Sequence, residues 1–310
     1  VPPGEVASWI EELPRPVAIT GGTGFVGSHL VETLCAAGLE PRVLVRDASS
    51  PRWIAGAPVR LVAGSLGDVA ALEELVDGAG CVLHLAGVLR AGTAAEFDRG
   101  NREGTANLVR AVRLRASKAR LVHVSSLAAR EPQLSPYATS KRLGEKALVE
   151  RAGKMRWAAL RPSAVYGPGD REMLPLFRWM DRGIAPILGS EGARFSLLYV
   201  EDLAAAVLRW LHSETCSARQ FELHDGHPQG YTWDAVINAA AQLRGGPILR
   251  LQVPVLVPRL LAAVNVMAAR AMGYAPMLTP GKVCELRHPD WVCDNAPFSR
   301  ETGWKPKISL

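Results

Sequence analysis

Continuous apolar runs alternate with amphipathic stretches over the first half of the chain. The apolar runs predict strands at 16–20, 42–46, 59–64, 81–87, 119–126 and 157–167. Between them, apolar residues that recur every three or four positions predict helices at 27–38, 69–78, 102–116 and 140–152. Strands that alternate with helices form parallel βαβ units, so we expect an α/β fold, a doubly wound parallel sheet of the Rossmann type.

The alternation ends near residue 167, and Pro- and Gly-rich turns with mixed helices follow. We expect residues 1–167 to form mainly the doubly wound domain. Residues 168–310 are expected to form mainly a smaller lobe against the carboxyl edge of the sheet, interleaved with the first domain in one compact unit. In this half the strand-like run 219–223 precedes HDGH, from His224 to His227, which we interpret as a turn rather than a metal motif.

The most apolar tract lies in the second half, at residues 253–272. It is interrupted by Pro254, Pro258, Arg259, Asn265 and Arg270, so it is not expected to span a membrane. Three interpretations stay open. The tract could be ordinary helix packing within the smaller lobe, a lid over an apolar ligand, or a surface that rests on a bilayer with its arginines at the headgroups.

The composition is that of a globular protein. Of the 310 residues, 48% are hydrophobic and 21% are charged, which argues against a disordered chain. The net charge of +6 suits an anionic ligand or a membrane surface, but no basic run carries interleaved aromatics, so nucleic-acid binding is not expected. The five cysteines are scattered, without the close pairs of a zinc site, and indicate reduced thiols in the cytoplasm: Cys35, Cys81, Cys216, Cys284 and Cys293.

A glycine-rich stretch, ITGGTGFVGSHL, follows the first predicted strand and opens the first predicted helix. Gly21, Gly24 and Gly27 permit a tight turn, close approach of a pyrophosphate to the backbone, and tight packing of the helix on the strand. Because the pattern stands at the first βα junction, it predicts a dinucleotide site. The expected contacts are Gly21, Thr23, Gly24, Phe25, Val26 and Gly27.

The end of the second strand bears on the choice of cofactor. An acid at this place accepts a hydrogen bond from the ribose 2′-hydroxyl of NAD, whereas an arginine suits the 2′-phosphate of NADP. Arg46 stands there, followed by Ser49 and Ser50, which can donate to a phosphate. We therefore favour NADP(H). Asp47, one residue further on, leaves NAD(H) open, and Arg46 as an ordinary surface cation is the remaining alternative.

The stretch SPYATSK places Tyr137 and Lys141 four residues apart, behind Ser125 and Ser126. On a helix these two side chains share one face. The pair could belong to a solvated helical face. Alternatively it is an acid whose proton release a nearby cation eases, since an ammonium lowers the pKa of a phenol that otherwise titrates at about 10.

The motifs TGGTGFVG, HLAG, NREGTANL, VSS, YATSK and RPSAVYGPG occur in this order within residues 16–205. In these motifs the chain resembles the extended and atypical short-chain dehydrogenase/reductases, the NAD(P)-dependent epimerase/dehydratase superfamily. The resemblance implies that Tyr137 is the acid/base, that Lys141 lowers its pKa and binds the nicotinamide ribose, and that Ser126 hydrogen-bonds the reacting oxygen. It also implies a structural and proton-relay role for Asn101, for which a helix N-cap is the alternative.

The same resemblance implies further contacts and no metal ion. Toward the cofactor, besides Tyr137 and Lys141, these contacts are Ser65, Leu66, Leu85, Ala86, Gly87, Pro162, Ala164 and Val165. Ser65 stands where the family usually has an aspartate for the adenine. Toward the substrate the implied contacts are Val88, Ser126, Leu127, Tyr166 and Arg194.

Three departures from the family bear on the substrate. The loop from Ser126 to Tyr137 is shorter than in the family's nucleotide-sugar enzymes. Ala164 stands where those enzymes often have an asparagine on the diphosphate, and Phe195 where they often have an arginine, with Arg194 one place away. Each lost charge-assisted hydrogen bond would cost a dianion roughly 1.5–3 kcal/mol, although a register shift of one residue would restore Arg194.

These features lead to three hypotheses. The first is an NAD(P)H-dependent oxidoreductase that reduces a ketone on an apolar, lipid-like substrate, in keeping with a resemblance to the group that holds the 39-kDa subunit of complex I and bacterial ceramide (3-oxo-sphingoid) reductases. The second is a nucleotide-sugar epimerase or dehydratase with bound NAD. The third is a non-catalytic dinucleotide-binding subunit, against which the intact Ser126, Tyr137 and Lys141 argue.

For the first hypothesis the expected partners follow from the substrate and the composition. They are a lipid-like small molecule, a second copy of the chain in a homodimer, and the inner face of the cell membrane as a peripheral contact. The expected location is cytoplasmic.

Overall fold

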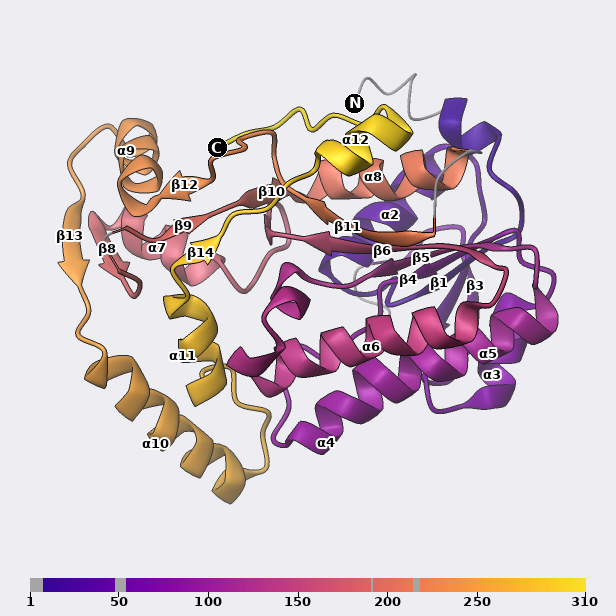
Figure 1. Cartoon of the computed structure of the whole chain (residues 1–310), viewed down its shortest axis with the longest axis horizontal. Coiled ribbons are helices and arrows are strands. Elements are labelled where there is room, and N and C mark those ends of the chain that lie inside the picture. Colours follow the sequence, from indigo (N-terminus) through magenta and orange to yellow (C-terminus); the bar gives the residue numbers. More distant parts are fainter. Residues whose placement is uncertain (1–7, 48–53, 191, 214–217) are drawn as a thin grey trace.

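The computed structural model describes residues 8–47, 54–190, 192–213 and 218–310 of the chain. Its centre is a parallel sheet of seven strands (Figure 1). Their order across the sheet is β11 (Arg219–Leu223), β6 (Arg156–Pro162), β5 (Arg120–Val124), β4 (Cys81–His84), β1 (Val17–Thr20), β2 (Arg42–Val45) and β3 (Arg60–Ala63). The strand order reverses between β1 and β4, and the carboxyl ends of the strands around such a reversal form the ligand crevice of doubly wound sheets.

Helices cover both faces of this sheet (Figure 1). On one face α2 (Phe25–Ala36) packs beside α8 (Val200–His212), together with α12 (Ala296–Thr302). On the other face lie α3 (Val69–Val76), α5 (Gly104–Arg115) and α6 (Pro136–Ala152). All four residues of β1 are buried, which explains why the strands are continuous apolar runs rather than alternating ones.

The predicted doubly wound α/β fold is confirmed, but the stretch expected as one strand at 157–167 is two strands. β6 stays in the central sheet and ends at Pro162, which has no N–H to extend the ladder. β7 (Ala164–Tyr166) pairs instead with β10 (Leu197–Tyr199). The seventh strand of the sheet, β11, comes from the strand-like run in the second half of the chain.

Two helices begin earlier than the apolar pattern indicated. The helix expected at 102–116 starts as α4 (Ala94–Phe97) and passes through a π-helical turn at Asp98–Glu103 into α5. The helix expected at 140–152 starts at Pro136, because the Ser135 hydroxyl accepts a hydrogen bond from the Ala138 N–H at 2.9 Å. Pro136 suits the first helical position, where no N–H is needed. This shift moves Tyr137 into the first turn of α6.

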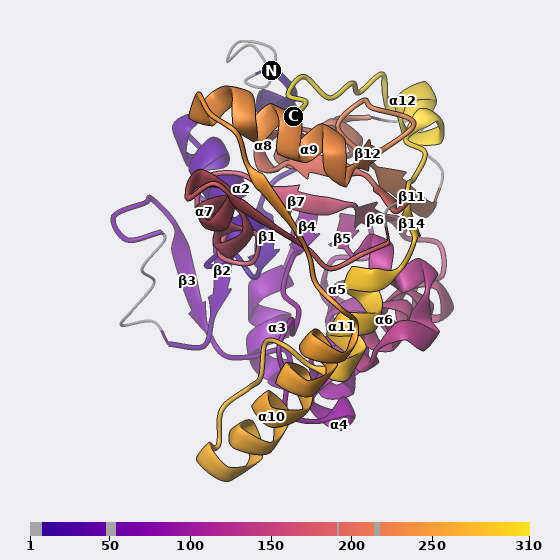
Figure 2. The same ribbon diagram turned by 90° about the vertical axis from the view of Figure 1, so that its left-hand side faces the viewer.

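The smaller lobe is built from short strands and helices (Figure 2). β8 (Ile184–Ile187) pairs with β13 (Leu249–Gln252), while β9 (Arg194–Phe195) pairs with both β12 (Tyr231–Thr232) and β14 (Asp290–Trp291). The helices are α7 (Leu174–Asp181), α9 (Trp233–Arg244), α10 (Leu256–Met272) and α11 (Pro280–Arg287). An apolar cluster that includes Met180, Leu197 and Ile237 forms its core. Residues after 167 serve both parts, since α8, β11 and α12 return to the central sheet.

One buried ion pair ties α6 to the sheet. Glu145 of α6 is almost fully buried, and its two carboxylate oxygens accept hydrogen bonds from the Arg161 guanidinium of β6 at 2.8 and 2.6 Å. The Ser125 hydroxyl, just beyond the end of β5, donates to the same carboxylate at 2.6 Å. The pair therefore sets the position of α6 relative to the ends of β5 and β6.

Further charges extend this pair toward the smaller lobe. Arg161 also faces Glu222 of β11 at 3.8 Å, and Glu222 faces Arg130 at 3.6 Å. Arg130 donates hydrogen bonds to the carbonyl of Asp290 in β14 at 2.8 Å and to the carbonyl of Val292, just after β14, at 2.7 Å. The network thus connects α6, the sheet and the last strand of the smaller lobe.

Arg161→Met is expected to lower the free energy of unfolding by about 3–5 kcal/mol, because it leaves a buried carboxylate without its cation. The matched control is Arg142→Met. Arg142 faces the same carboxylate at 3.7 Å, but its side chain is 53% exposed, so the expected loss is below about 1 kcal/mol. Urea unfolding measures both losses. Equal losses in the two variants would contradict the role given to Arg161.

Candidate active site

The glycine loop between β1 and α2 has the shape that a pyrophosphate requires. Gly21 has a φ of +76°, and a Cβ added there would lie 2.4 Å from the backbone nitrogen of Ala86. A Cβ at Gly27 would lie 2.0 Å from the carbonyl oxygen of Gly21. Gly24 precedes the first turn of α2 and offers no side-chain cap, so the N–H groups of that turn remain available to an anion. The loop therefore fits a dinucleotide phosphate.

The chain after β4 runs beside this loop and meets two predicted polar residues. Leu85 donates its N–H to the Thr20 carbonyl at 3.0 Å, and Ala86 crosses over Gly21. A Cβ added to Gly87 would lie 3.2 Å from Asn101 Oδ1 and 3.5 Å from Lys141 Nζ. The residue at this place has to be small because Asn101 and Lys141 converge on it.

Asn101 lies inside a continuous helix, so the alternative that it caps a helix is wrong. It is buried in the π-helical turn between α4 and α5. Its Oδ1 accepts from the Val88 N–H at 2.7 Å, and its Nδ2 donates to the Val88 carbonyl at 3.0 Å and to Ser140 Oγ at 2.8 Å. The wider π turn aims this amide at the chain after β4, in keeping with the frequent occurrence of π turns at functional sites.

Ser126, Tyr137 and Lys141 gather around the carboxyl end of β5. Ser126 caps the short helix at Leu127–Arg130, where its hydroxyl accepts from the Ala128 N–H at 3.2 Å. Lys141 is buried on α6, and its ammonium donates to the Val124 carbonyl at 3.0 Å. Tyr137, one turn earlier on α6, is half-buried and meets the edge of Phe97 at 6.1 Å between ring centroids.

Burial dominates the acid–base properties of these groups. It raises the pKa of the Tyr137 phenol well above its usual value. A hydrogen bond with the Ser126 side chain acts in the opposite direction, and the charges of Glu285 and Glu172 add to the rise. Burial also lowers the pKa of Lys141 to about 8, and the charge of Glu145 partly opposes this decrease. The direction for Tyr137 is opposite to the expected lowering by Lys141, because desolvation of the phenol outweighs its neighbours.

The other residues predicted to touch a cofactor lie along the same edge of the sheet. Arg46 directly follows β2 with an exposed side chain, while Ser49 and Ser50 lie outside the described residues. Ser65 follows β3, and its hydroxyl accepts from the Gly67 N–H at 3.2 Å. Leu66 lies against Gly104 of α5. Pro162 ends β6, and Ala164 and Val165 begin β7, beyond the carboxyl end of the sheet.

Two residues predicted to touch the substrate differ in their surroundings. The Tyr166 hydroxyl is buried and has no hydrogen-bond partner among the described residues, and burial next to Asp225 raises its pKa to about 12. Its ring meets Tyr199 edge-on at 5.4 Å. Arg194 instead donates to the Gln229 carbonyl at 2.9 Å and is held on the smaller lobe.

Sequence patterns missed two groups next to the catalytic candidates. Glu285 of α11 accepts a hydrogen bond from the Ser135 hydroxyl that caps α6, and its other oxygen faces Lys282 at 3.1 Å. Gly281 allows this approach, since a Cβ there would lie 2.8 Å from Ser135 Cβ. No local pattern signals a contact between elements so distant in the chain.

The second missed group is a buried histidine behind the reaction centre. His84 bridges Thr20 Oγ1 at 2.7 Å and Thr105 Oγ1 at 2.9 Å, and the Thr105 hydroxyl donates to the Asn101 carbonyl at 2.6 Å. Burial and the charge of Lys141 lower the pKa of His84 to about 3, so it is neutral. Its position inside a strand made it look like an ordinary core residue.

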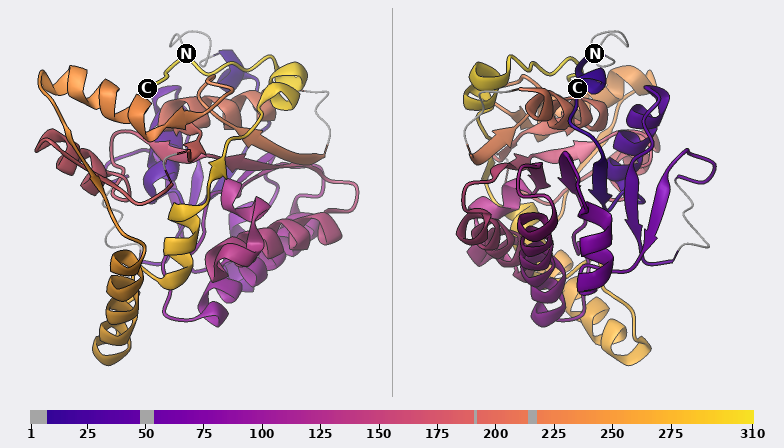
Figure 3. Two further views of the ribbon diagram at one scale, coloured as in Figure 1. Left: turned by 60° about the vertical axis from the view of Figure 1, so that its left-hand side comes forward. Right: turned by 90° about the vertical axis from the view of Figure 1, so that its right-hand side faces the viewer.

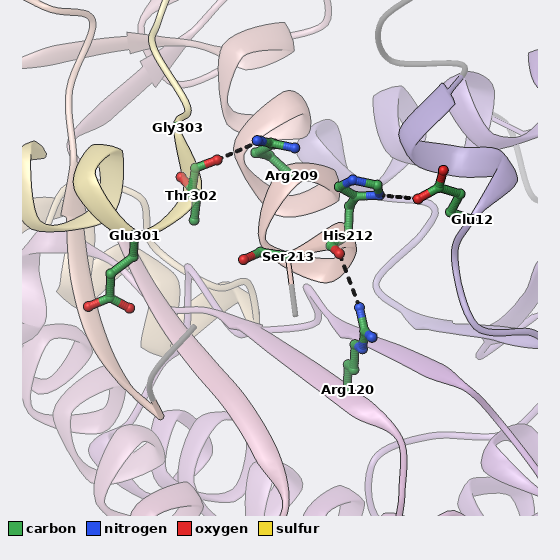
Figure 4. Close-up of a pocket in the computed structure, with 8 residues that line it drawn as sticks. All are labelled: Glu12, Arg120, Arg209, His212, Ser213, Glu301, Thr302 and Gly303. Carbon is green, nitrogen blue, oxygen red and sulfur yellow. Dashed lines mark hydrogen bonds and ion pairs between the residues drawn. The ribbon is translucent and has the colours of Figure 1, made fainter. Parts of the chain in front are cut away.

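A cavity lies at the amino end of β5, whereas the catalytic candidates gather at its carboxyl end (Figure 4). It surrounds Arg120, at the amino end of β5, and the end of α8, and its other lining residues are Glu12, Arg209, His212, Ser213, Glu301, Thr302 and Gly303. Its charges are already engaged. Arg120 donates to the Leu211 carbonyl, Arg209 donates to the Thr302 carbonyl at 2.6 Å, and His212 faces Glu12 at 3.4 Å. Arg120 thus closes the carbonyl end of α8, and Arg209 closes that of α12, which are structural roles.

The other sequence expectations concern metals, cysteines and the membrane. HDGH is a turn after β11, where the Gly226 N–H donates to His224 Nδ1 at 3.0 Å. Within the described ranges no three His, Cys, Asp or Glu side chains are placed to hold a metal ion, and the four cysteines found there are free thiols. Cys216 lies outside these ranges. Searched over the same residues, no helix combines the length and hydropathy needed to cross a membrane.

The chain is similar to known proteins over most of its length. The sequence profile of the NAD dependent epimerase/dehydratase family matches residues 17–221. A ceramide reductase of Caulobacter vibrioides is 41% identical over 316 residues, covering 94% of this chain and 96% of that protein. A 2-alkyl-3-oxoalkanoate reductase of Stenotrophomonas maltophilia is 24% identical over 323 residues, covering 95% and 96%. The solved structure of MoeE5 in complex with UDP-glucuronic acid and NAD has a TM-score of 0.72 at 21% identity over 95% of each chain, which shows a common fold.

Lys141→Met tests the lowered pKa of Lys141. Between its folded pKa of about 8 and its ordinary value of 10.5, the unfolded chain binds more protons than the folded chain, so folding stability rises with pH. From pH 8 to pH 10 the free energy of unfolding of the wild type should therefore rise relative to that of Lys141→Met, by at most about 1.4 kcal/mol per pH unit.

Urea unfolding at fixed ionic strength measures this difference. The matched control is Lys146→Met on the same helix, because the Lys146 side chain is 67% exposed and its variant should track the wild type at every pH. If the difference between the wild type and Lys141→Met stays constant across the window, Lys141 titrates normally and its burial does not matter.

Proposed function

The chain belongs to the NAD dependent epimerase/dehydratase family, and from that premise we propose that it is an NADP(H)-dependent reductase of a ketone on a lipid-like substrate, the 3-oxo group of a sphingoid base or ceramide. It is an oxidoreductase acting on CH–OH and C=O groups, as its family and the reductases similar to it indicate. The observation that carries the proposal is the convergence of Asn101, Lys141 and Gly87 beside the glycine loop, with Tyr137 one turn away on α6.

We assign proton donation to Tyr137. Burial keeps its phenol protonated, so the phenol can donate to the carbonyl oxygen as that oxygen gains negative charge, while the Ser126 hydroxyl stabilises the same oxygen. The glycine loop and Lys141 would hold a nicotinamide cofactor, which when bound would provide the hydride that, with the proton from Tyr137, balances the conversion of ketone to alcohol. We assign the return of a proton to Tyr137 to Lys141, which has a pKa of about 8 and converges with the Asn101 amide on Gly87.

The chain's own groups divide the work of holding the cofactor. The N–H groups in the first turn of α2 bind the pyrophosphate, and Lys141 binds the ribose next to the nicotinamide. Arg46 selects NADP(H), because its exposed guanidinium at the end of β2 can pair with a 2′-phosphate. NAD(H) is the alternative. It is supported by the family description, which names NAD, and by the structure of MoeE5, which contains NAD.

A lipid-like substrate accounts for the missing diphosphate contacts. Ala164 offers no side-chain donor, and Phe195 packs against Trp233 at 5.2 Å between ring centroids. Arg194 is already bound to the Gln229 carbonyl. Each methylene of an acyl chain that is buried contributes roughly 0.8 kcal/mol, so an apolar pocket can supply the affinity that a diphosphate clamp would provide. The Tyr166 hydroxyl, which has no hydrogen-bond partner in the described part of the chain, supplies a polar contact for a headgroup amide or hydroxyl.

The proposed surroundings of the enzyme follow from this substrate. We place it in the cytoplasm with peripheral contact at the inner face of the membrane, where a ceramide-like lipid resides. A homodimer stays a prediction from the sequence, which analytical ultracentrifugation of the purified chain measures. The small molecule remains the principal partner.

Arg46→Asp is expected to reverse or remove a preference for NADPH over NADH. The loss of one charge-assisted contact and the repulsion of a carboxylate should weaken NADPH binding roughly tenfold or more, whereas NADH binding should stay the same or improve. Fluorescence titration of both cofactors against wild type and variant gives the four dissociation constants. An unchanged ratio in the variant would show that Arg46 does not contact the 2′-phosphate.

The wild type should oxidise NADPH in the presence of a detergent-dispersed 3-oxo-sphingolipid and ignore UDP-glucose and UDP-galactose. Tyr137→Phe should lose at least a hundredfold in turnover with little change in cofactor affinity, because only the donated proton is removed. Spectrophotometric turnover and cofactor titration measure the two effects, and Tyr274→Phe, at an exposed tyrosine of the smaller lobe just after α10, is the matched control with normal turnover.

Three outcomes would change the assignment. Interconversion of the UDP-sugars without lipid reduction would replace the ketoreductase by the epimerase. Near-wild-type turnover in Tyr137→Phe would exclude Tyr137 as the acid. Tight cofactor binding with no turnover of any carbonyl substrate would support the non-catalytic subunit.

A further inference from the structure

Helix α10 exposes most of its apolar side chains. Its large residues Leu256, Leu260 and Met267 are 72%, 68% and 69% exposed, and Val257, Leu261, Val264 and Met272 are also exposed. Only Pro258, Ala262 and Ala269 are buried. The helix lies at the outer margin of the smaller lobe, beside α11 and away from the central sheet (Figure 3). Packing within the lobe therefore accounts for one side of the helix and leaves its large apolar side chains uncovered.

The exposed residues form one continuous face with cations along its border. Each residue turns a helix by about 100°, so Leu256, Leu260, Val264 and Met267 follow one line, and Val257, Leu261 and Met272 lie beside it. Arg259 and Arg270 are three turns apart and fall on the same side, at one edge of this face. An apolar face bordered by arginines is the pattern of helices that lie in a membrane interface.

The apolar surface and the charge bias extend beyond the helix. Leu249 and Leu251 of β13 precede it, Tyr274 and Met277 follow it, and all four are exposed. Over residues 249–277, which we call the arm, the sequence contains arginines but no aspartate or glutamate. Arg250 pairs with Asp234 of α9 at 3.1 Å, so Arg259 and Arg270 are the cations that the arm offers to a partner.

We propose that the arm docks on a lipid bilayer that carries anionic headgroups. The apolar face of α10 enters the boundary between headgroups and acyl chains, and Arg259 and Arg270 contact the phosphates. A second copy of the chain fits less well, because a symmetric contact between two arms brings arginines together with no acid of the arm to neutralise them. The docking itself does not depend on the proposed lipid substrate. Only the benefit of docking rests on it, namely that the enzyme stays where that substrate resides.

The arm is also close in the structure to the catalytic helix. It leads directly into α11, whose Glu285 accepts a hydrogen bond from Ser135 at the start of α6. Tyr137 follows Ser135 after a single residue, Pro136. A bilayer in contact with α10 would therefore be connected to the proposed proton donor through α11 and the start of α6.

Vesicle flotation of the full chain tests the docking. Wild type should float with vesicles of phosphatidylcholine and phosphatidylglycerol and bind vesicles of phosphatidylcholine alone more weakly. Leu260→Glu/Met267→Glu should reduce binding to the mixed vesicles roughly tenfold or more. Arg259→Gln/Arg270→Gln should reduce it roughly fivefold for each arginine and remove the preference for the anionic lipid. The matched control is Leu243→Glu on α9, where an even more exposed leucine (92%) lies outside the arm, and its binding should be unchanged.

The same proteins separate docking from catalysis. NADPH oxidation with a water-soluble short-chain 3-oxo amide, in buffer without vesicles, should be equal in the wild type and all three variants. Vesicle binding by Leu260→Glu/Met267→Glu as strong as that of the wild type would overturn the proposal. So would a wild type that does not float but forms a dimer that this variant abolishes, since the second copy would then be the occupant. Normal flotation without reduction of any lipid ketone would refute the proposed substrate and leave the docking intact.

Discussion

The buried carboxylate of Glu145 fixes the arrangement on which the active site depends. It receives the guanidinium of Arg161 from β6 and the hydroxyl of Ser125 from the end of β5. Ser126 is the next residue in the chain, and Lys141 lies one turn before Glu145 on α6. The Glu145 carboxylate therefore positions both Ser126, at the end of a strand, and Lys141, on a helix. Because a buried ion pair tolerates little distortion before its desolvation is uncompensated, α6 cannot slide along the sheet without losing this pair.

A second contact holds the other end of α6. Ser135 satisfies the Ala138 N–H and donates to Glu285, and the Trp291 indole donates to the Glu285 carbonyl at 2.8 Å. Arg130, at the end of the short helix that Ser126 caps, donates to the backbone after β14. The smaller lobe is thus attached to the catalytic helix and to the serine loop at separate points. A movement of that lobe would reach Tyr137 through the cap of its helix rather than through the core of the sheet.

Local features of the sequence predicted the parts of the site that depend on short stretches of chain. The glycine loop and the Tyr137–Lys141 pair each lie within one βα unit, where backbone geometry follows from residue type. Contacts between distant segments were not accessible, because Glu145 and Arg161, or Ser135 and Glu285, are ordinary charged and polar residues until the fold brings them together. The π turn around Asn101 and the exit of β7 from the sheet also depend on tertiary partners, namely Val88 and β10. The apolar composition of α10 is evident from the sequence. Its exposure is not, because exposure depends on how few other elements of the lobe pack against the helix.

The electrostatic balance of the site favours proton donation. Burial raises the pKa of Tyr137 and lowers the pKa values of Lys141 and His84, so each group is shifted toward its neutral form. A phenol that holds its proton at neutral pH is suited to deliver it to an oxygen that becomes anionic, which is the need of ketone reduction. The reverse reaction needs the phenolate, which a hydrogen bond with Ser126 favours and which burial and the charges of Glu285 and Glu172 disfavour. Loss of the proton from the Tyr137 phenol is therefore the ionisation that desolvation opposes in this site, and alcohol oxidation would have to overcome the same desolvation.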